Sequence, residues 1–190
     1  MHSKLTTREE AAALGKDMCD ALPGLAEGFG ASKSWKKEYT RAVWRYFDDL
    51  RKTKTPHWIL WPKHPPTGGK VKGEYLTDFS LCDDELGYRI ACESEWGGYK
   101  SIEWAFDKLR AVKADTKILI FQDRHNVNGR LPDRIQRLFT TNFAKCAHHH
   151  PGHETYLFIQ FQGNKPRLFV WTPSECGPCD VNDIRIEAVN

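Results

Sequence analysis

The sequence contains no long apolar run. Nowhere do about 18 apolar residues follow one another, which is the length that a membrane-spanning helix needs. The first residues, MHSKLTTREEAAALG, also lack the apolar segment of a secretory signal peptide. We therefore expect a cytoplasmic protein without a transmembrane segment.

Cysteine is too scattered to indicate a disulfide framework. The six cysteines follow no secretory signal, which favours reduced thiols. The chain has one C-x-x-C pair, Cys176 and Cys179, and a zinc site needs further ligands. Cys146 and the histidines after it offer such ligands without a fixed spacing. Zinc at Cys176 and Cys179 is therefore an alternative, beside an exposed His-rich loop.

Two common catalytic motifs are missing. Gly68-Gly69-Lys70 does not have the G-x-x-x-x-G-K-[ST] spacing of a phosphate-binding P-loop. No G-x-S-x-G segment occurs, which argues against an α/β-hydrolase. Internal repeats and low-complexity tracts are absent too. The sequence therefore does not indicate a P-loop nucleotide site or an α/β-hydrolase site.

The composition is that of a chain with a sizeable core. Of its 190 residues 40% are hydrophobic, and they include seven Trp and ten Phe. That length suits a single domain over residues 1–190. The net charge of +3 neither requires nor excludes nucleic acid, because such binding needs a local basic patch.

Apolar periodicity predicts the order of the elements. Apolar residues at three- and four-residue spacing indicate helices, and alternating or continuously apolar runs bounded by Gly or Pro indicate strands. The expected helices cover residues 7–23, 34–50, 101–112 and 132–146. The expected strands cover residues 57–61, 74–81, 88–96, 117–121, 155–162 and 167–172. Ser101 is a candidate cap for the third helix. The order predicts an α/β fold with a sheet between layers of helices.

Three carboxylates stand out within the expected hairpin of residues 74–96. Side chains of a strand alternate between its faces, so Glu93 and Glu95 share one face and Cys92 points to the other. Asp78 and Glu93 are about equally far from the turn, so Asp78 is expected opposite Glu93. Adjacent carboxylates repel unless a cation lies between them, and Mg²⁺ or Mn²⁺ prefers such oxygen ligands. The alternative is a solvated, acidic strand face.

With these residues and this order of elements, the chain resembles the PD-(D/E)xK nuclease superfamily, which is restriction-endonuclease-like. That family has an α-β-β-β-α-β core, an Asp in the second strand and (D/E)-x-K in the third. Asp78 and Glu93 match the two acids, and Glu95 stands where the family has Lys. The E-x-E variant occurs in a restriction enzyme of this family. The resemblance covers residues 34–122, with an N-terminal helix in 1–30 and a C-terminal helix and hairpin in 131–173.

The resemblance implies roles for the site residues. Asp78, Glu93 and the backbone carbonyl of Ser94 are the metal ligands that it implies, with Glu38 of the preceding helix as an addition. Glu95 takes the position that orients or deprotonates the attacking water. For Glu38 the alternative is a solvated helix residue.

A lysine from the following helix is a further candidate for the catalytic group. Lys108 is the residue that would replace the missing family lysine, and its alternative is a surface lysine whose stem packs on the helix.

Basic residues before the acidic strand complete the hypothesis. Lys63, His64, Lys70 and Lys72 are candidates for nucleic-acid contacts, with an ordinary solvated loop as the alternative. The function expected is a Mg²⁺- or Mn²⁺-dependent nuclease acting on nucleic acid, DNA in the first place. The alternative function is a catalytically inactive nuclease fold that binds nucleic acid or a protein. A homodimer is compatible with either function.

Overall fold

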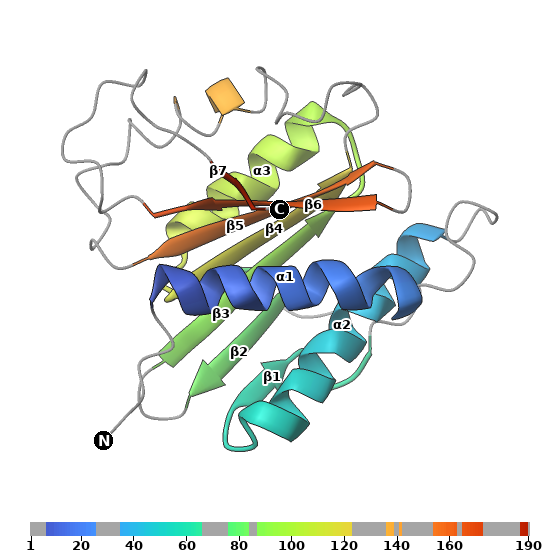
Figure 1. The fold of residues 1–190 in the computed structure, drawn as a ribbon, viewed down its shortest axis with the longest axis vertical. Helices are drawn as coiled ribbons and strands as arrows, with labels where there is room; N and C mark the ends of the chain where they lie inside the picture. Colours follow the sequence, from blue (N-terminus) through green and yellow to red (C-terminus); the bar gives the residue numbers. More distant parts are fainter. Residues whose placement is uncertain are drawn as a thin grey trace.

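The protein is described by a computed structural model, in which seven strands form one mixed sheet (Figure 1). The structure describes residues 7–25, 35–65, 76–83, 87–122, 136–138, 141, 154–162, 165–172 and 187–189. The expected α/β fold is confirmed at this level. None of the helices in these ranges is long and apolar enough to cross a membrane.

The strands lie in the sheet in chain order. They are β1 (Ile59–Trp61), β2 (Phe79–Asp83), β3 (Gly87–Glu95), β4 (Thr116–Gln122), β5 (Thr155–Gln162), β6 (Lys165–Trp171) and β7 (Glu187–Val189). The first three pair antiparallel, β3, β4 and β5 pair parallel, and the last three again pair antiparallel. The parallel centre is buried, as a sheet covered on both faces requires.

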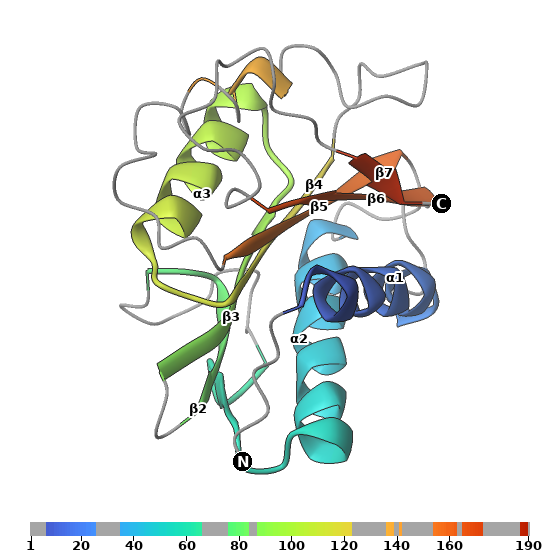
Figure 2. The same cartoon turned by 60° about the vertical axis from the view of Figure 1, so that its left-hand side comes forward.

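Helices cover both faces of this sheet. They are α1 (Arg8–Leu25), α2 (Trp35–Lys54) and α3 (Tyr99–Ala111). Figure 2 shows α1 and α2 on one face and α3 on the other. The core is divided accordingly, with Phe47 and Ile118 in the layer under α1 and α2, and Phe106 and Phe158 in the layer under α3.

The start of α1 is a capping box, as the spacing of Thr7 and Glu10 predicts. The backbone N–H of Glu10 donates to Oγ1 of Thr7, and the N–H of Thr7 donates to Oε2 of Glu10, both at 3.2 Å. The helix continues past Pro23 to Leu25, slightly beyond the expected end. Met18 and Leu22 are fully buried on its inner side.

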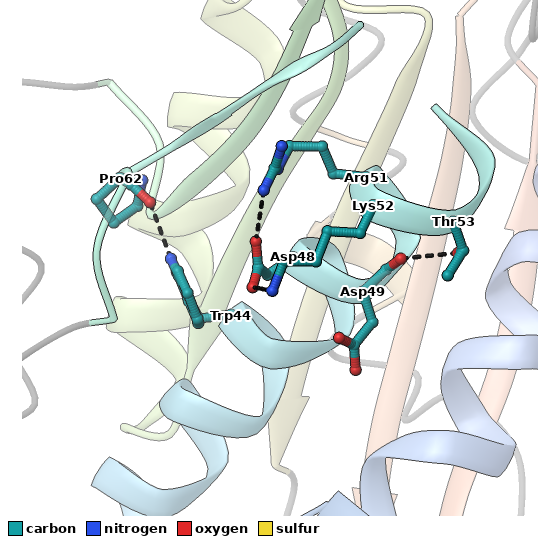
Figure 3. Close-up of polar contacts among 7 residues, drawn as sticks. All are labelled: Trp44, Asp48, Asp49, Arg51, Lys52, Thr53 and Pro62. Atoms are coloured by element: carbon teal, nitrogen blue, oxygen red, sulfur yellow. Dashed lines mark hydrogen bonds and ion pairs between the residues drawn. The ribbon is translucent and has the colours of Figure 1, made fainter. Parts of the chain in front are cut away.

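The second helix is tied to the strand that follows it (Figure 3). Nε1 of Trp44 donates to the carbonyl of Pro62 at 2.8 Å, which fixes the end of β1 beside α2. Near the end of the helix, Asp48 accepts from Arg51 at 3.0 Å and from Lys52 at 2.5 Å. Although burial raises the pKa of Asp48, these two partners together lower it below its ordinary value.

Two expectations about the elements need correction. The second strand covers residues 79–83 rather than 74–81, because β2 and β3 pair up to Asp83 and Gly87. Gly87 has φ 82°, a conformation that glycine adopts readily. Gly98, and not Ser101, is the N-cap of α3, and its cap has no side-chain hydrogen bond. The expected strands at 155–162 and 167–172 are confirmed as β5 and β6, whereas β7 was not expected.

Other expectations fall largely outside the described residues. Of the helix expected at 132–146, residues 136–138 and 141 are described, and they are helical. Cys146, Cys176 and Cys179 lie outside the described residues, so the zinc alternative has no structural description here.

Candidate functional site

Several strand ends meet at one edge of the sheet. Strands β3 and β4 are parallel, so their carboxyl ends, which include Glu95 and Phe121, lie side by side. The start of β2 lies at the same edge, because Phe79 pairs with Cys92 in an antiparallel register. Continuing this register by one residue places Asp78 opposite Glu93. The predicted pairing of these two acids is confirmed.

The two faces of β3 are used as alternation predicts. Ile90 and Cys92 are buried in the layer under α1 and α2, and Trp96 belongs to the same layer. Ala91 is buried under α3. Glu93 and Glu95 therefore belong to the face that α3 covers.

Hydrogen bonds join Asp78 to both Glu93 and Ser94. The backbone N–H of Asp78 donates to Oε1 of Glu93 at 2.9 Å. Oδ2 of Asp78 accepts from the N–H of Ser94 at 2.9 Å and from its hydroxyl at 3.1 Å. These contacts hold the side chain of Asp78 at the backbone of β3, directly beside Glu93.

The third member of the site comes from α3. Nζ of Lys108 forms an ion pair with Oε2 of Glu93, and the lysine side chain is 25% exposed. Lys108 thus has a buried acidic partner and differs from a freely exposed surface lysine. We call Asp78, Glu93 and Lys108 the acid–lysine cluster.

The carboxyl group of Glu93 is the most buried group of this cluster. Glu93 is 2% exposed. Burial is the largest cause that raises its pKa to about 8, and the nearby charge of Asp78 adds to it. The hydrogen bond and charge of Lys108 act in the opposite direction. A buried acid with an acidic neighbour and one cation is an arrangement common at functional sites.

Glu95 does not join the cluster. Its Oε1 accepts from the backbone N–H of Gly97 at 2.5 Å, which turns the carboxylate toward the loop before α3. Within the described ranges no three His, Cys, Asp or Glu side chains come together as a metal-binding group. The expected convergence of three carboxylates is therefore corrected to two carboxylates and a lysine.

Glu38 lies apart from the cluster. It is in the first turn of α2, and its Oε1 accepts from Nη1 of Arg41 at 3.3 Å. Both side chains of this pair are more than one third exposed. Among the described residues, Glu38 has no hydrogen bond or ion pair with Asp78 or Glu93.

The basic candidates are described only in part. Lys63 and His64 are exposed just after β1, and Nζ of Lys63 lies 4.8 Å from the ring centroid of Trp61. Trp61 pairs with Ser80, so the chain leaves β1 at the sheet edge that carries the acid–lysine cluster. Lys70 and Lys72 lie outside the described residues.

Two polar side chains on the same face were not singled out from the sequence. They are Gln160 on β5 and Arg167 on β6. Gln160 pairs with Phe121, the partner of Glu95, and Arg167 pairs with Gln160. Gln160 is fully buried, and among the described residues neither its Oε1 nor its Nε2 has a hydrogen-bond partner. Nη1 of Arg167 is likewise buried, without a hydrogen-bond partner within the described ranges. A polar residue inside a strand as apolar as β5 was the signal that could have found them.

Comparison with known proteins adds no relative. The chain matches no family model, no curated protein and no solved structure.

Proposed function

We propose that this protein is a metal-dependent nuclease that hydrolyses phosphodiester bonds of nucleic acid, with DNA as the substrate. The observation that carries the proposal is the acid–lysine cluster, in which Glu93 contacts the backbone of Asp78 through one oxygen and Lys108 through the other. Two acids and a lysine at one sheet edge are the groups that the PD-(D/E)xK resemblance requires.

The order of the elements agrees with the same resemblance. The segment α2-β1-β2-β3-α3-β4 has the α-β-β-β-α-β order, with Asp78 immediately before the second strand and Glu93 in the third. Lys108 then stands for the lysine that the motif lacks at position 95. A long side chain from the next helix reaches the same carboxylate.

The residues of the cluster fit a hard divalent cation. The carboxylate of Glu93 is almost fully buried beside a second acid, and in that setting a charge needs compensation. The carboxylates of Asp78 and Glu93 and the backbone carbonyl of Ser94 would hold Mg²⁺ or Mn²⁺, since all three offer oxygen ligands. When bound, the metal would lower the pKa of a coordinated water and compensate the negative charge of the phosphate.

The protein's own groups position the reaction. The bonds from Ser94 orient Asp78, and the N–H of Asp78 orients Glu93. The ammonium group of Lys108 is the cation that attracts the phosphate to this edge of the sheet and holds a proton beside the reacting groups. Fixing these groups before the substrate binds lowers the entropic part of the barrier.

One observation favours a second candidate, an inactive nuclease fold that binds nucleic acid. Both oxygens of Glu93 and Oδ2 of Asp78 already have protein donors, so the network is satisfied without a metal. In this alternative Lys108 is the structural counter-ion of Glu93 and does not act on a phosphate.

A cleavage assay separates the two candidates. Linear duplex, circular and single-stranded DNA are incubated with the protein and Mg²⁺, Mn²⁺ or EDTA. Cleavage that needs metal and is lost in Glu93→Gln, but kept in Glu9→Gln, supports the nuclease. Glu9 is an exposed acid at the start of α1 and serves as the matched control.

Calorimetric titration with Mn²⁺ supplies the second readout. Binding that is lost in both Asp78→Asn and Glu93→Gln supports the proposed metal ligands. If no substrate is cut, and Mn²⁺ binds neither the native protein nor the Glu9→Gln control, the nuclease proposal is rejected in favour of the inactive fold.

A further inference from the structure

One stripe of α3 leads directly to the acid–lysine cluster. Lys100, Trp104 and Lys108 follow at four-residue spacing, so their side chains lie along one side of the helix, about 6 Å apart. Lys108 reaches Glu93, and the other two residues continue the stripe toward the N-terminus of α3. Lys100 is exposed and has no ion pair among the described residues.

Trp104 is exposed to an unusual degree for its size. It is 68% exposed, and within the described ranges only Leu76, at 50%, and Tyr88, at 42%, are also large exposed hydrophobic residues. Leu76 precedes Asp78 by two residues, and Trp104 precedes Lys108 by one helical turn. Two of these three residues therefore flank the cluster, whereas Tyr88 lies at the opposite end of β3.

We propose that Trp104 stacks on an unpaired base of the strand whose phosphate lies at the acid–lysine cluster. The substrate is then single-stranded at this point, either along its whole length or at an opened end. The inference rests on the proposed nuclease function for the position of the phosphate, and it adds the class of substrate.

The residues of the stripe suit an unpaired base and the phosphates of its strand. An indole ring gains stacking energy from the face of any base, and cations on both sides of it attract the phosphates of the same strand. Asp107, which follows Trp104 by three residues, is paired with Arg110 at 2.7 Å. Inside a duplex each base face is already covered by its neighbours, so within the helix a protruding indole finds a partner only where a base is unpaired.

Binding is measured with the full-length protein and an end-labelled oligothymidylate, by fluorescence anisotropy with Ca²⁺ in place of Mg²⁺. Stacking on one base is worth about 5- to 150-fold in affinity when it is removed by alanine substitution. We therefore expect Trp104→Ala to weaken single-strand binding within this range and Trp104→Phe to retain most of it. Tyr88→Ala, which removes an exposed aromatic ring far from the cluster, is the matched control and should bind as the native protein does.

An abasic nucleotide tests the contact itself. A series of oligonucleotides carries one abasic nucleotide at successive positions. At one position the loss of affinity should not add to the loss caused by Trp104→Ala, because both changes remove the same stacking pair. Affinity for the duplex of the same sequence should change little in Trp104→Ala.

Each result bears on the inference separately from the nuclease proposal. Unchanged single-strand affinity in Trp104→Ala overturns the inference, and so does an equal loss on single strand and duplex. Full additivity with every abasic position overturns it too. Cleavage that does not depend on Trp104 supports the nuclease proposal and rejects the stacking contact. Single-strand binding that depends on Trp104, without cleavage, supports the stacking contact and rejects the nuclease proposal.

Discussion

Glu93 uses its two carboxylate oxygens for two different elements: Oε1 accepts from the backbone N–H of Asp78 at 2.9 Å, and Oε2 pairs with Nζ of Lys108. The first contact joins β3 to the start of β2, and the second joins β3 to α3. Because Glu93 is 2% exposed, the charge of its carboxyl group depends on these contacts more than on solvent. The protonation of Glu93 should therefore govern both metal binding and stability.

Removal of Lys108 should shift the pH range of metal binding to higher pH. The charge of Lys108 lowers the pKa of Glu93 against the effects of burial and Asp78, so Lys108→Ala raises this pKa above about 8. A metal binds the ionised carboxylate, so we expect Mn²⁺ affinity at neutral pH to fall about tenfold or more. Calorimetric titration from neutral to alkaline pH measures the shift, with exposed Lys113→Ala as the control. An unchanged pH dependence in Lys108→Ala would contradict the assigned ion pair.

Stability without metal should fall as pH rises. The pKa of Glu93 is raised from 4.5 to about 8, so the folded protein binds a proton more tightly than the unfolded chain does. The stabilisation from this proton is fully present below about 4.5 and is lost as pH rises through about 8. Glu93→Gln removes this contribution. In EDTA, the free energy of unfolding of the native protein should therefore decline relative to that of Glu93→Gln across this window. A constant difference between the two would falsify the raised pKa.

The arrangement of the two acids was predictable because it depends on local rules. Strand alternation places Glu93 on the face opposite Cys92, and the equal distance from the turn places Asp78 opposite Glu93. Both rules depend only on the pairing of β2 with β3. Apolar spacing likewise predicted the three described helices, with ends wrong by a few residues.

The rest of the site depends on packing that a single sequence does not show. Lys108 reaches Glu93 only because α3 lies over β3, and no spacing in the sequence predicts that distance. Glu95 fails to join the acids because the chain turns after β3 and presents the N–H of Gly97 to it. The exposure of Trp104 also follows from how α3 packs, since a tryptophan in an amphipathic helix is more often buried.

The buried amide of Gln160 should contribute nothing to stability. Neither of its polar atoms has a hydrogen-bond partner in the part of the chain that the structure describes, although the side chain is fully buried. Such an amide costs roughly 1–3 kcal/mol of desolvation, so Gln160→Met, which keeps the volume, should leave the free energy of unfolding unchanged or raise it by up to that amount. Urea denaturation measures the difference. A loss of more than about 1 kcal/mol would mean that the amide has a hydrogen-bond partner in the folded protein.

The ion pair of Lys117 and Glu154 should be the most sensitive polar contact of the core. Lys117 is fully buried, and its Nζ donates to Oε2 of Glu154 at 2.5 Å and to the hydroxyl of Tyr156 at 3.2 Å. Removing one charge leaves the other buried and uncompensated, so Lys117→Met or Glu154→Gln should each destabilise the protein by about 3–5 kcal/mol. The double variant, which removes both charges, should recover most of this loss. Urea denaturation of the four proteins measures the coupling. Additive losses would show that the two residues act independently, and that the pair does not hold the start of β4 against the start of β5.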